Sequence, residues 1–210
     1  MRRVFLLLTC VGPQLRALDL VRDGRALCPI ILPDDALPVV RAAAVELVHH
    51  IRLASGVDLT VVSEGEAPAT GEGVYLGRTA AALEQGLAVS AHEPNAFVIK
   101  LAGGRLFLLG DDSEGEPFWI LHENRTRVGT LFAVYEFLEQ HLGVRWIWPG
   151  ASGEIVPERT TIHVVRWDQV GRPAMVHTRW RDGPSSGAEG WADPVERSHF
   201  INDQSHWLRR

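Results

Sequence analysis

The stretch from Arg127 to Pro157, RVGTLFAVYEFLEQHLGVRWIWPGASGEIVP, determines most of what the sequence says about the fold. Apolar residues recur at helical spacing in its first half, which predicts a helix with one face against a core. Gly143 follows the last of them and suits the left-handed end of that helix. The sequence then predicts an aromatic strand over 144–148, a turn and a further strand. The apolar residues of the helix are Leu131, Val134, Tyr135, Leu138 and Leu142.

Upstream of this stretch, the sequence predicts strands and helices. A buried strand over 27–32 contains Pro29, which favours the start of a strand or an edge position. A helix over 37–54 follows and ends at Gly56. The remaining predicted elements are strands over 59–62, 74–76 and 159–167 and a helix from Thr79, its cap, to Gln85.

The clearest hairpin joins strands over 96–101 and 106–109 through Gly103-Gly104, which suits a two-residue turn. Since some strands are joined by hairpins and others through helices, we expect a mixed sheet. The predicted fold class is α+β, with a mixed, partly antiparallel sheet and helices packed mainly on one face. Residues 181–195 are rich in Gly, Ser and Pro and are typical of a loop.

The first seventeen residues have the layout of a secretory signal peptide. Arg2-Arg3 is basic, residues 4–11 are apolar, and Leu15-Arg16-Ala17 offers a cleavage site. Because this run is far shorter than the ~20 residues that cross a bilayer, no stable membrane span is expected. The prediction is a secreted or periplasmic protein. A lipoprotein acylated at Cys10 and a buried N-terminal strand are the alternatives.

The charge of the chain argues against nucleic-acid binding. The 210 residues include 21 Lys and Arg against 26 Asp and Glu, a formal charge of −5, and no basic cluster. A nucleic-acid-binding surface needs such a cluster. After cleavage Cys28 would be the single cysteine, and its apolar surroundings predict an inert packing residue. No phosphate-binding loop or other cofactor motif is present, so no cofactor is expected.

Three motifs carry a resemblance to a known family: Gly129–Glu139 (GTLFAVYEFLE), Gly143–Gly150 (GVRWIWPG) and Gly153–Pro157 (GEIVP). They resemble the N-terminal domain of α-glucuronidase-like glycoside hydrolases, in particular of large secreted bacterial proteins with an uncharacterised barrel. More distantly they resemble the second domain of β-hexosaminidases. Upstream, Asp23-Gly24, the IILP run at 30–33 and YLGRT at 75–79 lie in the expected order.

After the expected signal peptide over 1–17, the resemblance implies an α+β domain over 18–167 and a linker with the truncated start of a (β/α)8 barrel over 168–210. In such enzymes the barrel supplies the catalytic carboxylates and is the partner of this domain. A barrel needs about 250 residues, so this chain is expected to be a non-catalytic accessory domain, inactive alone, of an enzyme that degrades polysaccharides. The alternative is a stand-alone secreted carbohydrate-binding module.

Four residues are candidates for substrate binding. Arg145, Trp146 and Trp148 lie on the predicted aromatic strand, where both tryptophans would share one face and stack on sugar rings. Filling the core, or the joint with a barrel, is the preferred interpretation of these residues. Arg179 ends the possible first barrel strand, Met175–Arg179, where the resemblance implies contact with sugar hydroxyls; a structural ion pair is the alternative.

Other polar clusters have simpler interpretations. His199, Asp203 and His206 have a spacing that would place them on one helical face, where they could bind a metal, but a solvated helix face is the preferred interpretation. His49-His50 point about 100° apart on a helix, which is poor geometry for one shared ligand. Asp111 and Asp112, at a strand end, are expected to serve the turn; the acidic loop that contains them is expected to be solvated, with a weak cation site as the alternative, rather than catalytic. Its carboxylates are Asp111, Asp112, Glu114 and Glu116.

Overall fold

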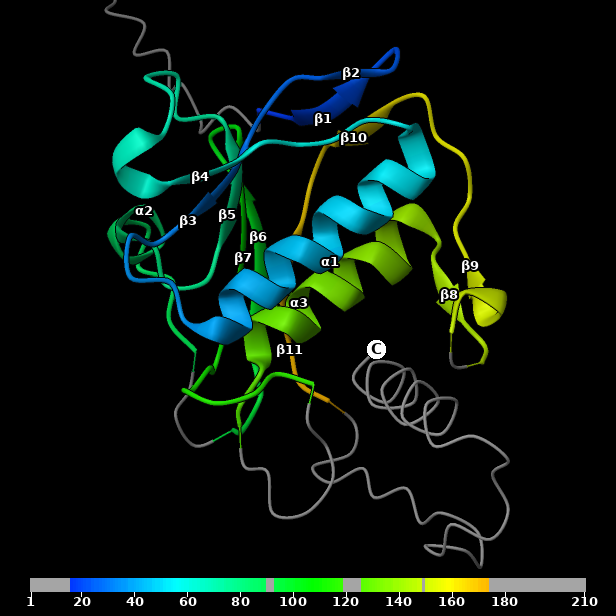
Figure 1. The fold of residues 1–210 in the computed structure, drawn as a ribbon. Helices are drawn as coiled ribbons and strands as arrows, with labels where there is room; N and C mark the ends of the chain where they lie inside the picture. Colours follow the sequence, from blue (N-terminus) through cyan, green and yellow to red (C-terminus); the bar gives the residue numbers. More distant parts are fainter. Residues whose placement is uncertain (1–15, 90–92, 119–125, 149, 174–210) are drawn as a thin grey trace, which may run out of the picture.

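Six strands form the central sheet of the computed structural model, in the order β11-β6-β7-β5-β3-β4 (Figure 1). Strands β7, β5, β3 and β4 run parallel, whereas β6 is antiparallel to β7 and β11. The structure describes residues 16–89, 93–118, 126–148 and 150–173. The strands are β3 (Ile30–Leu32), β4 (Val61–Ser63), β5 (Gly73–Leu76), β6 (Phe97–Ala102), β7 (Arg105–Gly110) and β11 (Asp168–Gly171).

Two long helices, α1 (Pro38–Ser55) and α3 (Gly129–Phe137), lie side by side on one face of the sheet (Figure 1). The apolar stripe of α1 is buried, and the helix ends at Gly56 with φ of 72°. Helix α3 continues as a π-helical segment, η2 (Leu138–Leu142), which ends at Gly143 with φ of 80°. Both glycines occupy the left-handed conformation that the sequence predicts for them.

The inner strands β3, β5, β6 and β7 bury most of both of their faces, because side chains alternate along them. Ile30, Leu76 and Leu108 pack in the larger core with α1 and α3. Ile31 and Phe107 point the other way, into a smaller cluster with the short helix α2 (Ala80–Glu84), which Thr79 caps by accepting the N–H of Ala82. Helices therefore cover mainly one face, and the predicted α+β class is confirmed.

Two smaller strand groups complete the described structure. One is a three-stranded sheet in the order β10-β1-β2, and the other is a two-stranded ribbon of β8 and β9 beside the ends of α1 and α3 (Figure 1). The first sheet contains β1 (Leu18–Arg22), β2 (Arg25–Ala26) and β10 (Ile162–Val164), and the ribbon contains β8 (Arg145–Trp146) and β9 (Glu154–Ile155).

Several predicted boundaries differ from the structure. The predicted aromatic strand over 144–148 is shorter in the structure, Arg145–Trp146, so that Ile147 and Trp148 lie beyond its end. The strand after Pro29 is internal to the sheet, and this proline precedes its first residue rather than lying at an edge. Strand β11 pairs with β6 along its whole length, so the folded unit continues beyond the expected boundary at 167.

Two glycines bring the end of β7 against the start of α3. A Cβ atom on Gly110 would overlap backbone atoms of Gly129 and Thr130, and one on Gly129 would overlap the backbone of Asp111 and Ala96. The N–H of Gly129 donates to Asp111 O over 3.0 Å, and the N–H of Gly110 donates to Thr130 Oγ1 over 3.0 Å. This contact fixes where α3 begins over the sheet.

We therefore predict that Gly110→Ala lowers the free energy of unfolding by about 3 kcal/mol or more, the scale of overpacking in a filled core. Urea denaturation measures the change. Gly65→Ala is the matched control, because its Cβ would meet only ordinary contacts at 3.6 Å; we expect it to change stability by less than about 0.5 kcal/mol. Equal effects of the two substitutions would contradict the role of the β7–α3 contact.

Candidate functional site: the β8–β9 ribbon and the loop after β7

The β8–β9 ribbon has an inner and an outer face. Arg145 pairs with Ile155 and Trp146 pairs with Glu154 in the antiparallel register. Because cross-strand partners point to the same side, Trp146 and Glu154 share one face, and Arg145 and Ile155 share the other. Trp146 packs against the main core, whereas Arg145 and Ile155 are exposed.

A buried polar cluster ties the inner face of the ribbon to α1. His50 of α1 is fully buried, and its Nδ1 lies 2.7 Å from the carbonyl oxygen of Glu46. Its Nε2 lies 2.7 Å from Glu154 Oε1, which also accepts a hydrogen bond from Trp146 Nε1 over 2.9 Å. Both ring nitrogens of His50 thus have polar partners, and Nε2 also lies 3.3 Å from Trp146 Nε1. We call His50, Glu154 and Trp146 the ribbon lock.

His49, the neighbour of His50 in α1, also lies near Glu154. His49 Nε2 lies 3.6 Å from Glu154 Oε2, while its side chain is 47% exposed. The two rings thus reach different oxygens of Glu154, and their poor placement for one shared ligand stays a prediction. Among the described residues, no three His, Cys, Asp or Glu side chains are grouped so that they could hold a metal ion.

Arg145 is occupied by the chain itself. Its Nη1 donates to the carbonyl oxygens of Glu139 and Val144 over 3.0 and 2.7 Å and lies 3.7 Å from Glu139 Oε1. These contacts satisfy carbonyl groups around the end of the helical segment, where helices commonly need a partner. The structure thus gives Arg145 a structural role and leaves it exposed at the surface.

Three apolar side chains of the ribbon region are exposed. Ile147 is 65% exposed, Trp148 is 62% exposed and Ile155 is 50% exposed. We call these three residues the ribbon patch. Gly153 makes this arrangement possible, because a Cβ there would overlap the backbone and Cβ of Trp148. The two tryptophans therefore have different environments: Trp146 is half-buried in the lock, and Trp148 is at the surface.

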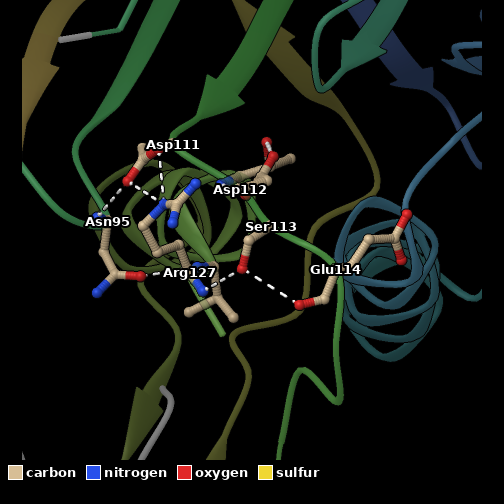
Figure 2. A network of polar contacts seen from close by, with 8 residues as sticks. Asn95, Asp111, Asp112, Ser113, Glu114 and Arg127 are labelled. Atoms are coloured by element: carbon tan, nitrogen blue, oxygen red, sulfur yellow. Dashed lines mark hydrogen bonds and ion pairs between the residues drawn. The ribbon is translucent and has the colours of Figure 1, made fainter. Parts of the chain in front are cut away.

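The acidic loop after β7 is organised around the start of α3. Figure 2 shows Asp111 linked to both Asn95 and Arg127. Arg127 Nε lies 2.8 Å from Asp111 Oδ2, and Asn95 Oδ1 accepts the N–H of Val128 over 2.7 Å. Asp111 thus serves the turn after β7, as the sequence predicts, and its side chain is only 13% exposed. These contacts link the residue just after β7 to the residues just before α3.

Asp112 holds the first turn of α3. Its Oδ1 accepts the N–H of Thr130 over 2.8 Å, and its Oδ2 accepts the Thr130 hydroxyl. A carboxylate at a helix N-terminus satisfies an unpaired N–H and interacts favourably with the helix dipole. Burial nevertheless raises the pKa of Asp112 to about 6, because the hydrogen bonds from Thr130 offset only part of the desolvation.

Three predictions remain: the inert Cys28, the sites in the C-terminal residues, and the absence of a membrane span. Cys28 is buried, and its burial raises the pKa of the thiol to about 12, which confirms an inert thiol. Arg179 and the possible metal ligands His199, Asp203 and His206 lie outside the described residues. No helix in the described part of the chain is long and apolar enough to cross a membrane.

Sequence reasoning missed His50, Glu154 and Asp112 as partners. His50 lies one residue before the buried Ile51 and three after Leu47, so its position on the buried stripe of α1 was a usable signal. Glu154 lies in the GEIVP motif, but its contact with His50 spans 104 residues of sequence. Such a pairing depends on how the ribbon folds back over α1.

The ribbon lock predicts a large effect for Glu154→Ala. This change leaves the buried ring of His50 and the indole N–H of Trp146 without their shared acceptor, at a cost of about 3 kcal/mol in the free energy of unfolding. His49→Ala is the control, since a half-exposed side chain at 3.6 Å should contribute less than about 1 kcal/mol. Urea denaturation compares the two; a loss below 1 kcal/mol for Glu154→Ala would contradict the lock.

Asp112→Asn should change how stability depends on pH. In the wild type the folded state keeps the Asp112 proton up to pH of about 6, whereas the unfolded chain releases it near the ordinary value of 3.8. Stability is therefore lost as pH rises through this window, by about 3 kcal/mol for two pKa units. The neutral asparagine removes that loss.

We expect the stability difference between Asp112→Asn and wild type to move in favour of the variant by about 3 kcal/mol from pH 3.5 to pH 7.5. Denaturation curves at several pH values measure it, and the subtraction cancels titration of all other groups. A difference that stays constant over this range would contradict a raised pKa for Asp112.

Comparison with known proteins supplies a fold relative. No family model and no curated protein match the chain. Among the solved structures that match is a family GH115 4-O-methyl-α-glucuronidase with specificity for decorated arabinogalactans, at a TM-score of 0.54 and 15% sequence identity. The match covers 91% of this chain and 25% of that chain, so this chain spans about a quarter of the length of that enzyme. The chain thus shares its fold with part of a family GH115 glucuronidase.

Proposed function

We propose that this chain is a non-catalytic accessory domain of a secreted α-glucuronidase-like glycoside hydrolase that acts in polysaccharide breakdown beside a catalytic barrel. The observation that carries the proposal is the fold shared with a quarter of a much longer glucuronidase. A fold that occurs as one part of an enzyme is consistent with a supporting role. The motifs from Gly129 to Pro157 point to the same class of enzyme independently of the structural match.

The use of carboxylates in the described residues supports a non-catalytic role. Glycoside hydrolysis needs two carboxyl groups on either side of the sugar, about 5 to 9.5 Å apart. Asp111 pairs with Arg127, Asp112 holds the start of α3, and Glu154 belongs to the ribbon lock. Each of these shielded carboxylates therefore has a structural task.

The start of the described fold is compatible with removal of a signal peptide. Strand β1 begins at Leu18, directly after the expected cleavage site at Ala17. Leu18 and Leu20 are buried, so the strand would stay intact in the mature protein. Cleavage would remove the pair of Arg16 with Glu72, an exposed contact at 3.6 Å that contributes little to stability.

The proposal predicts that the purified chain does not release uronic acid from 4-O-methylglucuronosyl oligosaccharides or from arabinogalactan. The measurement is reducing-end or uronate analysis after prolonged incubation, compared with heat-denatured chain. Circular dichroism on the same sample shows that the chain is folded. Release above the control that disappears in a variant of a described carboxylate, such as Glu154→Gln, would contradict a non-catalytic role.

A stand-alone carbohydrate-binding module is the second candidate, favoured by the exposed indole of Trp148. Aromatic rings stack on sugars, but selective binding also needs polar groups placed around the ring. The neighbouring polar groups are engaged within the chain: Arg145 bonds to the helix end, and Trp146 bonds to Glu154. Calorimetric binding of an oligosaccharide, abolished by Trp148→Ala, would favour this candidate.

A further inference from the structure

We propose that the ribbon lock closes on one shared proton, held between His50 and Glu154, and that the β8–β9 ribbon is released from α1 when this proton leaves. The ribbon is thereby a pH-sensitive latch, which is held in mildly acidic solution and freed as the solution becomes alkaline. This latch goes beyond the proposed function and does not depend on it, because it follows from the hydrogen-bond partners of one buried histidine.

One ring nitrogen of His50 carries a hydrogen because of its partner. Nδ1 lies 2.7 Å from the carbonyl oxygen of Glu46, and a carbonyl oxygen only accepts hydrogen bonds. The contact therefore requires an N–H at Nδ1. A neutral imidazole has a single N–H, so a neutral His50 in this position has only a lone pair at Nε2.

The other ring nitrogen of His50 faces a carboxyl oxygen. Nε2 lies 2.7 Å from Glu154 Oε1, which is the separation of a hydrogen bond. A bare nitrogen and an ionised carboxylate oxygen would point lone pairs at each other across this distance, so a proton has to lie between them. This requirement holds whether the proton belongs to the imidazole or to the carboxyl group. The closed lock thus contains one proton more than a neutral histidine beside an ionised glutamate.

The indole N–H of Trp146 does not replace this proton. Trp146 Nε1 lies 2.9 Å from Glu154 Oε1 and 3.3 Å from His50 Nε2. Since those two atoms are themselves 2.7 Å apart, the three form a triangle, and the indole hydrogen lies beside the contact of His50 with Glu154 rather than within it. The shorter distance favours the carboxyl oxygen as its acceptor.

Burial makes the lock depend on its proton. The side chain of His50 is 0% exposed and that of Glu154 is 9% exposed. If the proton leaves, both groups are left facing each other without water to satisfy them, which is costly in a buried site. Opening the ribbon exposes both groups to water. A ribbon of two two-residue strands has little stability of its own to oppose this movement.

Other ionisable groups surround the lock. His49 of α1 lies 3.6 Å from Glu154 Oε2, and because it is also a histidine, an experiment has to separate its protonation from that of the lock. The remaining groups come from the elements packed around the ribbon: the buried Glu46 of α1, Tyr135 of α3, whose ring lies 5.4 Å from that of Trp146, and Arg145 of β8, which pairs with Glu139 on the other face.

The proton count determines how the latch responds to pH. A solvated histidine loses its proton near pH of about 6.5, whereas the closed lock keeps one. Opening above this pH therefore releases a proton, and each further pH unit raises the ratio of open to closed lock by up to about tenfold. Between pH of about 4.3 and about 6.5 a solvated pair also keeps one proton, so the ratio is constant there.

Hydrogen–deuterium exchange of the full chain at pH of about 6 and about 9 tests the proposal, with each rate divided by the intrinsic amide rate at the same pH. In wild type, the corrected exchange of peptides that contain β8 and β9 should accelerate by at least about tenfold at the higher pH. The β6–β7 hairpin should not accelerate, which shows that the domain remains folded.

The matched variant is Glu154→Gln. Its amide oxygen can accept the indole N–H of Trp146, and its amide nitrogen can donate to Nε2 of a neutral His50, so the lock closes without the extra proton. We expect no acceleration of ribbon exchange in this variant. His50→Gln removes the titrating ring and should abolish the acceleration as well, whereas His49→Ala should retain it.

Three results overturn the proposal. The first is ribbon exchange in wild type that does not accelerate with pH, and the second is equal acceleration in wild type and in folded Glu154→Gln or folded His50→Gln. The third is loss of the acceleration in His49→Ala, because this result would assign the pH response to the exposed histidine instead of the lock.

Discussion

The close approach of two backbones, at Gly110 and Gly129, is the constraint on which the rest of the structure depends. It sets the start of α3 over the end of β7, and Asp112 and Thr130 complete that junction with hydrogen bonds. Once α3 is placed, its π-helical continuation and Gly143 determine where the chain leaves the helix layer. The ribbon, with its exposed apolar residues, begins directly after this helix end.

The second organising feature is the ribbon lock. Ribbons of two short strands are marginal by themselves, and β8 and β9 contain two residues each. The contact of Glu154 with His50 and Trp146 gives this ribbon a buried anchor on α1. Glu154 and Trp146 are thereby used inside the domain, whereas Arg145 and Ile155 on the other face are exposed.

Much of the fold could be predicted because its signals are local. The stripe of α1, the cap at Thr79 and the left-handed ends at Gly56 and Gly143 each depend on a few neighbouring residues, and all are present in the structure. Strand β11 was missed since its sequence, DQVG, has little strand propensity and is held by pairing with β6.

The candidate site was harder to predict because its contacts are distant in sequence. From the sequence, Asp112 is expected to serve a turn. Its contact with Thr130, 18 residues later, arises only because the fold brings the start of α3 beside it. Trp146 and Trp148 would share a face on a regular strand, but β8 ends at Trp146 and the tight turn at Gly153 separates their environments. Tertiary packing, rather than the alternation of side chains, decides which tryptophan is exposed.

The central claim is that this fold serves a larger glycoside hydrolase, and the most direct test is to sequence the gene beyond codon 210 in all reading frames. The account predicts an open frame of several hundred codons that encodes alternating strands and helices of a barrel, with two carboxylates suitable for glycoside hydrolysis. A stop directly after codon 210, with no barrel encoded downstream, would contradict it.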